Sequence, residues 1–238
     1  STYGMLITRT DWDVPKHGGI TFFIFPMKQD GVEIRPINQI TGESDFNEIF
    51  ITEARVPARY IVGELNAGWK VLQTALAYER LIMGEGATER RGKEKSALPP
   101  LVELAKRHGQ LEDPALRQKV AQAVAYRQLN ALNMKRAKAE IIANGSSSLM
   151  SLGKLAMSRI QHGEARVASE ILGAQSLLDG EDFSDAAEMN FDSAKAYMNS
   201  IGGGSDQIQR NIIAERILGL PREFEIDRNI PFREVKTG

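Results

Sequence analysis

Cysteine is absent from this sequence of 238 residues. Its absence excludes disulfide bonds, thiolate metal ligands and cysteine nucleophiles, and it fits a reducing compartment, so we expect a cytoplasmic protein. Histidine is scarce as well, because only His17, His108 and His162 occur. These three stand far apart, without the i,i+4 pairing of a helical metal site, so we expect no bound metal.

Long apolar runs are lacking, so we expect no membrane span. Charge of one sign is not in excess either: 30 basic and 31 acidic side chains give a formal net charge of −1. This balance argues against a nucleic-acid-binding surface, although it leaves room for a local basic patch. The sequence starts with Ser1, with neither an initiator methionine nor a signal peptide. We therefore expect a fragment or a processed piece of a longer protein.

Two regions of different periodicity are present. In the first, short runs rich in β-branched and aromatic residues predict strands, at residues 4–10, 20–26, 32–36 and 48–52. From Gly68 onward the apolar spacing becomes helical, and we expect helices at residues 68–95, 101–108, 113–143, 146–172, 184–200 and 205–218.

The predicted fold is therefore a β segment, residues 1–62, followed by an all-α, up-down helical bundle, residues 63–238. A sheet of this size without a second layer is an improbable free domain. We expect its strands to complete a sheet whose other strands precede residue 1.

A carboxylate interrupts the apolar stripe of the first helix. Steps of three and four place Trp69, Leu72, Leu76, Glu79 and Met83 on one helical face. Burial raises the pKa of a carboxyl group, and a base tuned towards neutral pH suits abstraction of a weakly acidic carbon proton. A structural ion pair explains the same position, and the residues alone favour that interpretation.

A run of three glycines, residues 202–204, precedes the last helix. Glycines let the backbone approach a ligand closely, and the helix start offers N–H groups to a phosphate or an oxyanion. A plain flexible turn is an equally good interpretation. Asp206 would repel an anion if it pointed inward, and it could instead cap the helix and face solvent.

Three segments carry a resemblance to a known family. Residues 39–57 contain QITGESDFNEIF, residues 68–80 begin GWKV and end YER, and residues 201–216 contain GGGSDQIQRNIIAER. Together they resemble the acyl-CoA dehydrogenase family over essentially the whole sequence. The resemblance implies the late part of a middle β-domain followed by the C-terminal helical domain.

The resemblance also implies a catalytic base. Many members carry the catalytic glutamate in a Tyr-Glu-Gly-Thr loop, where this sequence has Gly203. A minority carry it on a helix directly before an arginine, and Glu79-Arg80 matches that pattern. The implied reaction is abstraction of the acyl-CoA α-proton by Glu79, with hydride transfer to FAD, which yields the trans-2-enoyl-CoA. The Gly203 N–H would polarise the thioester oxygen, and Arg80 would help to fix the base and the substrate.

The cofactor implied by the resemblance is FAD. Its candidate contacts in this sequence are Arg107, Gly204, Ser205, Gln207, Glu170 and Gly173. The segment after Arg107 departs from the family pattern, as does the segment around Glu170 and Gly173. The family tryptophan and Ser/Thr that contact the flavin ring lie upstream of residue 1.

The partners implied by the resemblance are an acyl-CoA, an electron-transfer flavoprotein that takes the electrons, and further subunits. Members form a dimer of dimers, a homotetramer or its heteromeric equivalent, in which a neighbouring subunit completes each flavin site. The pathway implied is lipid catabolism by β-oxidation. Two alternatives stay open: a non-catalytic or shared-site subunit of a heteromeric dehydrogenase, and a non-enzymatic binding protein on the same scaffold, including a nucleic-acid-binding one.

Overall fold

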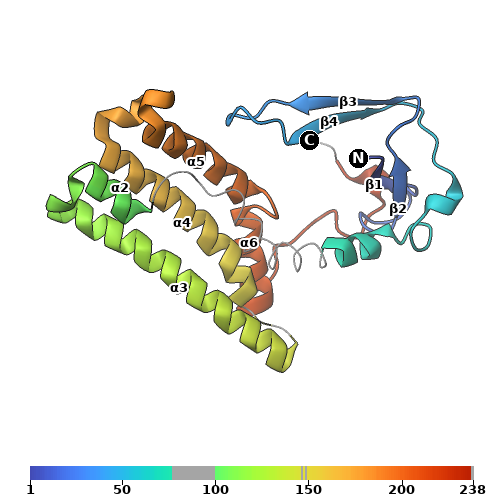
Figure 1. Cartoon of the computed structure of the whole chain (residues 1–238). Helices are drawn as coiled ribbons and strands as arrows, with labels where there is room; N and C mark the ends of the chain where they lie inside the picture. Colours follow the sequence, from blue (N-terminus) through green and yellow to red (C-terminus); the bar gives the residue numbers. More distant parts are fainter. Residues whose placement is uncertain (77–99, 146, 148, 237–238) are drawn as a thin grey trace. The chain divides into compact units, whose positions relative to one another are not determined.

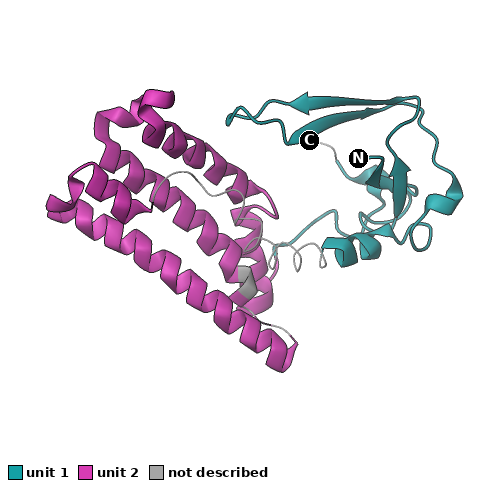
Figure 2. Cartoon of the chain, in the orientation of Figure 1, with its two compact units in different colours: residues 1–95, 223–238 teal, residues 96–222 magenta. Residues whose placement is uncertain are grey.

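The computed structural model describes residues 1–76, 100–145, 147 and 149–236. The chain forms two compact units: unit 1 comprises residues 1–95 and 223–238, and unit 2 comprises residues 96–222 (Figure 2). The boundary that the sequence suggests between residues 62 and 63 stays a prediction. Glu79 and Arg80 lie outside the described residues.

Unit 1 contains the four predicted strands, which form two antiparallel pairs (Figure 1). Strand β1 (Tyr3–Arg9) pairs with β2 (Ile20–Pro26), and β3 (Val32–Ile37) pairs with β4 (Phe46–Ile51). The β3–β4 pair exposes apolar side chains, namely Ile34, Ile37, Phe46, Ile49, Phe50 and Ile51. Exposed apolar side chains in such number are typical of a surface that contacts another layer. That these strands complete a larger sheet stays a prediction.

The best-packed part of unit 1 lies where the first helix begins against β2. Phe22 and Phe25 are buried there, and the Thr21 hydroxyl, fully buried, accepts the Asn66 N–H at 2.9 Å. A Cβ atom on Gly68 would lie 2.4 Å from the backbone nitrogen of Phe22. Only glycine therefore fits at position 68. The described part of this helix comprises residues 68–76.

The C-terminal segment, residues 223–236, belongs to unit 1, which the sequence did not predict. The Phe232 N–H donates to the Val14 carbonyl at 3.0 Å, and the Arg233 N–H donates to the Trp12 carbonyl at 3.1 Å. The Arg9 guanidinium lies 3.6 Å from the centroid of the Phe232 ring. This cation–π contact and the two backbone bonds hold the segment against the β1–β2 connection.

Unit 2 is a bundle of α-helices, as predicted (Figure 1). Its helices are α2 (Leu101–Arg107), α3 (Pro114–Asn144), α4 (Leu149–Leu172), α5 (Ser184–Ile201) and α6 (Asp206–Ile212). A π-helical stretch, Ile213–Ile217, continues α6, where the sequence suggested an uninterrupted α-helix to residue 218.

Local signals explain the helix ends. Asp113 caps α3 by accepting the N–H groups of Ala115 and Leu116. Gly145 ends α3 at φ 77°, a conformation that glycine adopts without strain. The Ser147 hydroxyl accepts the Leu149 N–H at 3.2 Å and so starts α4.

The core of unit 2 lies at the end of the bundle formed by α2, the start of α3, the end of α4 and the start of α5. It consists of Leu101, Leu104, Ala105, Leu116, Val120, Ala123, Val167, Ala168, Ile171, Leu172, Ala186 and Met189. Within the described ranges, no helix is both long enough and apolar enough to cross a bilayer.

We expect the substitution Leu104→Ala to lower the free energy of unfolding by about 2–5 kcal/mol, because a fully buried leucine leaves a cavity when it is truncated. Leu177→Ala is the matched control, because this side chain is 87% exposed and should contribute less than about 0.5 kcal/mol. Urea unfolding followed by circular dichroism measures both. Equal effects of the two substitutions would contradict this location of the core.

Candidate functional site

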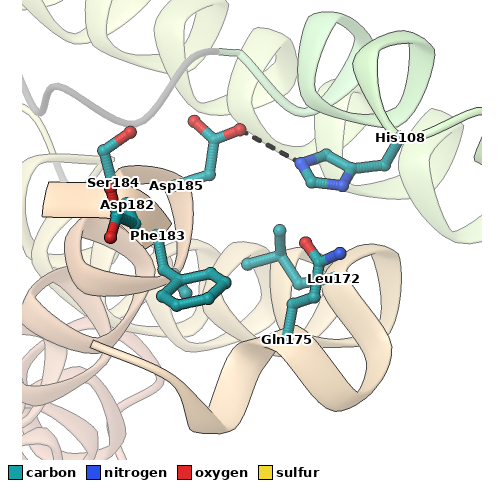
Figure 3. Close-up of a pocket in the computed structure, with 8 residues that line it drawn as sticks. His108, Leu172, Gln175, Asp182, Phe183, Ser184 and Asp185 are labelled. Atoms are coloured by element: carbon teal, nitrogen blue, oxygen red, sulfur yellow. Dashed lines mark hydrogen bonds and ion pairs between the residues drawn. The ribbon is translucent and has the colours of Figure 1, made fainter. Parts of the chain in front are cut away.

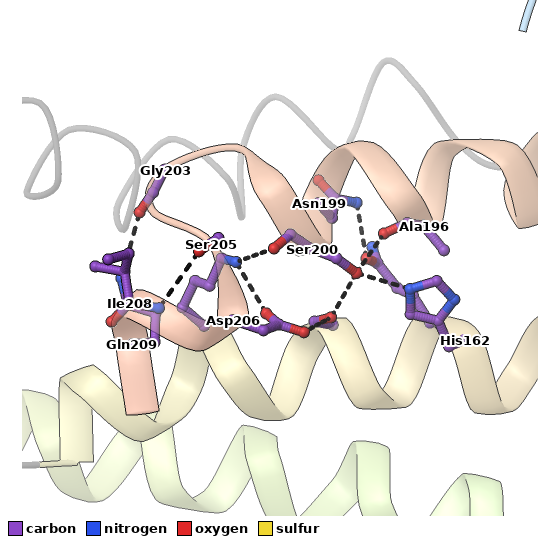
Figure 4. A network of polar contacts seen from close by, with 12 residues as sticks. His162, Ala196, Asn199, Ser200, Gly203, Ser205, Asp206, Ile208 and Gln209 are labelled. Atoms are coloured by element: carbon purple, nitrogen blue, oxygen red, sulfur yellow. Dashed lines mark hydrogen bonds and ion pairs between the residues drawn. The ribbon is translucent and has the colours of Figure 1, made fainter. Parts of the chain in front are cut away.

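The glycine loop, which we define as residues 202–205, joins α5 to α6 (Figure 4). Gly203 and Gly204 have φ values of 65° and 94°. A Cβ atom on Gly203 would meet nothing within 4 Å, so the backbone here borders open space. Among the described residues, no acceptor takes the Gly203 N–H. This N–H group can therefore donate to a ligand.

Ser205 caps α6, in place of Asp206, which the sequence offered as a possible cap. Its hydroxyl oxygen accepts the Ile208 N–H at 3.3 Å, and the hydroxyl can still donate its own proton. The Gln209 amide is buried and donates to the Gly203 carbonyl at 3.4 Å. Gln207 is exposed. The candidate flavin contacts Gly204, Ser205 and Gln207 are thus adjacent in one loop and its following turn.

Asp206 points inward, which was one of two possibilities left by the sequence. Its carboxylate accepts a hydrogen bond from Ser158 at 2.7 Å and pairs with Lys154 at 3.0 Å (Figure 4). Burial by itself would raise the pKa of Asp206, but the Ser158 hydrogen bond and the Lys154 charge outweigh it, so the pKa lies below 3.8. The cation of Lys154 also compensates the negative charge that would otherwise repel an anion at the loop.

The prediction from sequence missed three side chains of α4 in this region: Lys154, Ser158 and His162. All three contact Ser200 in the last turn of α5, through its carbonyl or its hydroxyl. Their spacing of four residues was a usable signal, because it places polar side chains on one face of a helix. We call Lys154, Ser158, His162, Ser200 and Asp206 the polar network.

Arg107, a candidate for the flavin phosphates, lies at the other end of α5. Its Nη1 atom contacts both carboxylate oxygens of Asp185, at 2.7 and 3.0 Å, and its side chain remains 51% exposed. His108 shares the same carboxylate at 3.1 Å. Arg107 therefore offers an anion only part of its guanidinium, because Asp185 engages one nitrogen.

A small hollow of about 100 Å³ lies beside the contact between His108 and Asp185 (Figure 3). His108, Asp185, Phe183, Leu172 and Gln175 are among the residues that line it. It is too small for a dinucleotide, but it places polar and aromatic groups next to Asp185, the partner of Arg107.

Glu170 and Gly173 lie at the same end of the bundle as Arg107. Glu170 pairs with Lys119 of α3 at 2.5 Å. Gly173 follows α4 at φ 56°.

The candidate cofactor residues thus fall into two groups at opposite ends of α5. This helix has 18 residues, so the groups are about 27 Å apart. The glycine loop and Arg107 of one chain cannot both touch the same small group.

The family model for the acyl-CoA dehydrogenase C-terminal domain matches residues 66–218, more than half of the chain. The chain belongs to the acyl-CoA dehydrogenase family. The match covers α2 to α6 and therefore both groups of candidate residues. The fold expected from the sequence, a β segment followed by a C-terminal helical domain, is confirmed by solved structures of the family.

Two curated acyl-CoA dehydrogenases are similar to the chain over most of its length. IpdE1 of Mycolicibacterium smegmatis is 36% identical over 222 residues, which cover 92% of this chain and 54% of the relative. FadE34 of Mycobacterium tuberculosis is 34% identical over 223 residues, which cover 92% and 29%. The chain thus spans about half, or less, of the length of these relatives.

A solved structure named Tcur3481-Tcur3483 steroid ACAD is similar to the chain with a TM-score of 0.78 and 27% identity. The similarity covers 94% of this chain and 58% of the solved one.

We expect Asp206→Asn to lower the free energy of unfolding by about 1.5–3 kcal/mol at neutral pH, because it removes a charge-assisted hydrogen-bond acceptor. The folded-state pKa of Asp206 is depressed, so its contribution is complete above pH 3.8 and is lost as the pH falls through the lower folded-state value. The difference between wild type and variant should therefore shrink below pH 3.8. Urea unfolding across this range measures it, and a difference that is constant with pH would disprove the assignment.

Proposed function

We propose that the protein containing this chain is an FAD-dependent acyl-CoA dehydrogenase that converts an acyl-CoA thioester to the trans-2-enoyl-CoA. The observation that carries the proposal is Gly203. Its N–H has no acceptor among the described residues, its φ is positive, and a Cβ atom built on it would meet nothing within 4 Å. Family membership supplies the reaction class.

The Gly203 N–H is proposed to donate to the thioester oxygen. An unactivated α-proton is too weakly acidic for a carboxylate, so the negative charge that develops on that oxygen needs a donor. One well-placed donor of this kind contributes about 3 kcal/mol. A backbone N–H performs this role whatever the side chain, so it survives the replacement of the usual loop glutamate by glycine.

The proposed base is Glu79, with Arg80 fixing it and the substrate. The loop position holds no carboxylate, so the base has to come from another element. The residues of the helix start that the structure describes support this: Trp69 and Leu72 are half-buried, and Trp69 stacks on His17 with ring centroids 4.0 Å apart. Leu76, three residues before Glu79 in the sequence, is 38% exposed.

The glycine loop fits a flavin, because its glycines leave room for a close approach and Ser205 and Gln207 add polar groups. Arg107, Glu170 and Gly173 lie about 27 Å away, the length of α5, and are proposed to contact the flavin of a neighbouring subunit. The chemistry that FAD would supply when bound is to accept the hydride from the β-carbon of the acyl group. The dimer of dimers, the electron-transfer flavoprotein and the cytoplasmic location belong to the same proposal.

The proposed substrate carries a bulky acyl group. The related structure is named a steroid ACAD. The open space at Gly203 supports the same choice, because a loop without a side chain leaves more room beside the thioester.

We expect Glu79→Gln in the full-length protein to retain flavin and to reduce the rate of flavin reduction by about 10²–10⁴-fold, because it removes the base and keeps its shape. Stopped-flow bleaching with an acyl-CoA that reduces the wild type measures the rate. Glu112→Gln is the control, because this carboxylate is exposed in a 3₁₀ turn between α2 and α3. Near-normal reduction of the Glu79 variant would disprove the role of Glu79.

The second candidate is a subunit that shares its active site within a heteromer. The name of the related structure joins two designations, which supports this candidate. In that case the full-length chain expressed alone should bind flavin below one equivalent per chain and should not be bleached by any acyl-CoA. Flavin content and bleaching, measured on the chain alone, separate the two candidates. One equivalent of flavin that bleaches would exclude the second.

A further inference from the structure

The two ends of the glycine loop are tied to the same two side chains of α4 (Figure 4). The Lys154 ammonium donates to the Ser200 carbonyl at 3.2 Å and to the Asp206 carboxylate at 3.0 Å. The Ser158 hydroxyl contacts the Ser200 hydroxyl at 2.8 Å and the other Asp206 oxygen at 2.7 Å. Each of these α4 side chains therefore bridges the last turn of α5 and the first turn of α6.

The bridges are poorly accessible to water. Ser158 is 1% exposed, and the side chains of Lys154 and Asp206 are 23% and 18% exposed. At such sites, loss of one partner leaves the other charge without compensation. The two charges also complement the helix dipoles, because the Lys154 cation lies at the C-terminal carbonyls of α5 and the Asp206 anion lies at the start of α6.

Two further hydrogen bonds hold the same end of α5. The His162 imidazole contacts the Ser200 hydroxyl at 2.7 Å, and the side-chain amide of Asn199 donates to the side-chain amide oxygen of Gln161 at 2.7 Å. The loop between these anchors contains three consecutive glycines, the residues with the greatest conformational freedom. The direction of the Gly203 N–H therefore depends on how firmly the two loop ends are held.

We propose that Lys154 and Asp206, with Ser158, are positioning residues that hold the glycine loop in the conformation that aims the Gly203 N–H at the bound substrate. They act through the loop and touch no reacting atom. This inference rests on the proposed function for its catalytic consequence, while the restraint on the loop can be measured independently.

The test uses the full-length protein with Lys154→Gln, Asp206→Asn and the double variant. The first readout is hydrogen exchange at the amides that flank the loop: Gly202, bonded to the Met198 carbonyl, and Ile208, bonded to the Ser205 hydroxyl. We expect each single variant to speed exchange at both amides by about tenfold or more, because local opening becomes easier. Exchange in the double variant should be no faster than in the faster of the two single variants, because the two side chains act as one unit.

The second readout is flavin reduction by an acyl-CoA. We expect the reduction rate constant to fall by about tenfold or more while the Kd of the acyl-CoA changes by less than about threefold, because the restrained N–H acts mainly in the transition state. Lys154→Arg should restore most of the rate, since a guanidinium can reach both the carbonyl and the carboxylate. Ser158→Ala, a smaller change, serves if the charge variants do not fold.

Arg127→Gln is the matched control. Arg127 of α3 forms an ion pair with Glu164 of α4, outside the polar network. The inference fails if the Lys154 and Asp206 variants match this control in exchange at Gly202 and Ile208. Faster exchange without slower reduction refutes the catalytic part. If no acyl-CoA reduces the wild type but exchange responds as expected, the proposed function fails and the loop restraint stands.

Discussion

The packing of α4 against α2, α3, α5 and α6 is the constraint on which the arrangement of unit 2 depends. The C-terminal half of this helix is apolar where it meets the core: Ala168 and Ile171 are almost fully buried. Its N-terminal half presents polar side chains to the ends of α5 and α6. One helix therefore supplies the hydrophobic burial that stabilises the bundle and the hydrogen bonds that locate the glycine loop.

This division explains why the candidate residues separate into two groups. At the apolar end of the bundle, the Asp185 carboxylate contacts both Arg107 and His108 beside the core. At the polar end, the loop exposes the Gly203 backbone while the charge of Asp206 is satisfied internally. A straight helix of 18 residues keeps the two ends about 27 Å apart, so one small group cannot contact both of them.

Many local elements could be predicted from the sequence because their causes are local. Asp113-Pro114 and Asn144-Gly145 fix the ends of α3 through capping and backbone conformation. The strands follow from β-branched and aromatic runs, and their paired registers agree with this. The return of residues 223–236 to unit 1 could not be predicted, because contacts such as Arg9 with Phe232 join residues more than 200 positions apart, and no sequence period encodes such a pairing.

By itself, the sequence determined the β-then-α organisation, the glycine loop and, through its resemblance, the acyl-CoA dehydrogenase family. These depend on spacing and on residue types within single segments. Only the tertiary structure decided that Ser205 rather than Asp206 caps α6 and that Asp206 turns inward. It also decided that the Asp185 carboxylate pairs with one nitrogen of the Arg107 guanidinium. The inward turn of Asp206 and the ion pair of Arg107 depend on partners from distant segments: Lys154 and Ser158, for example, stabilise the inward carboxylate because helix packing brings them within hydrogen-bonding distance.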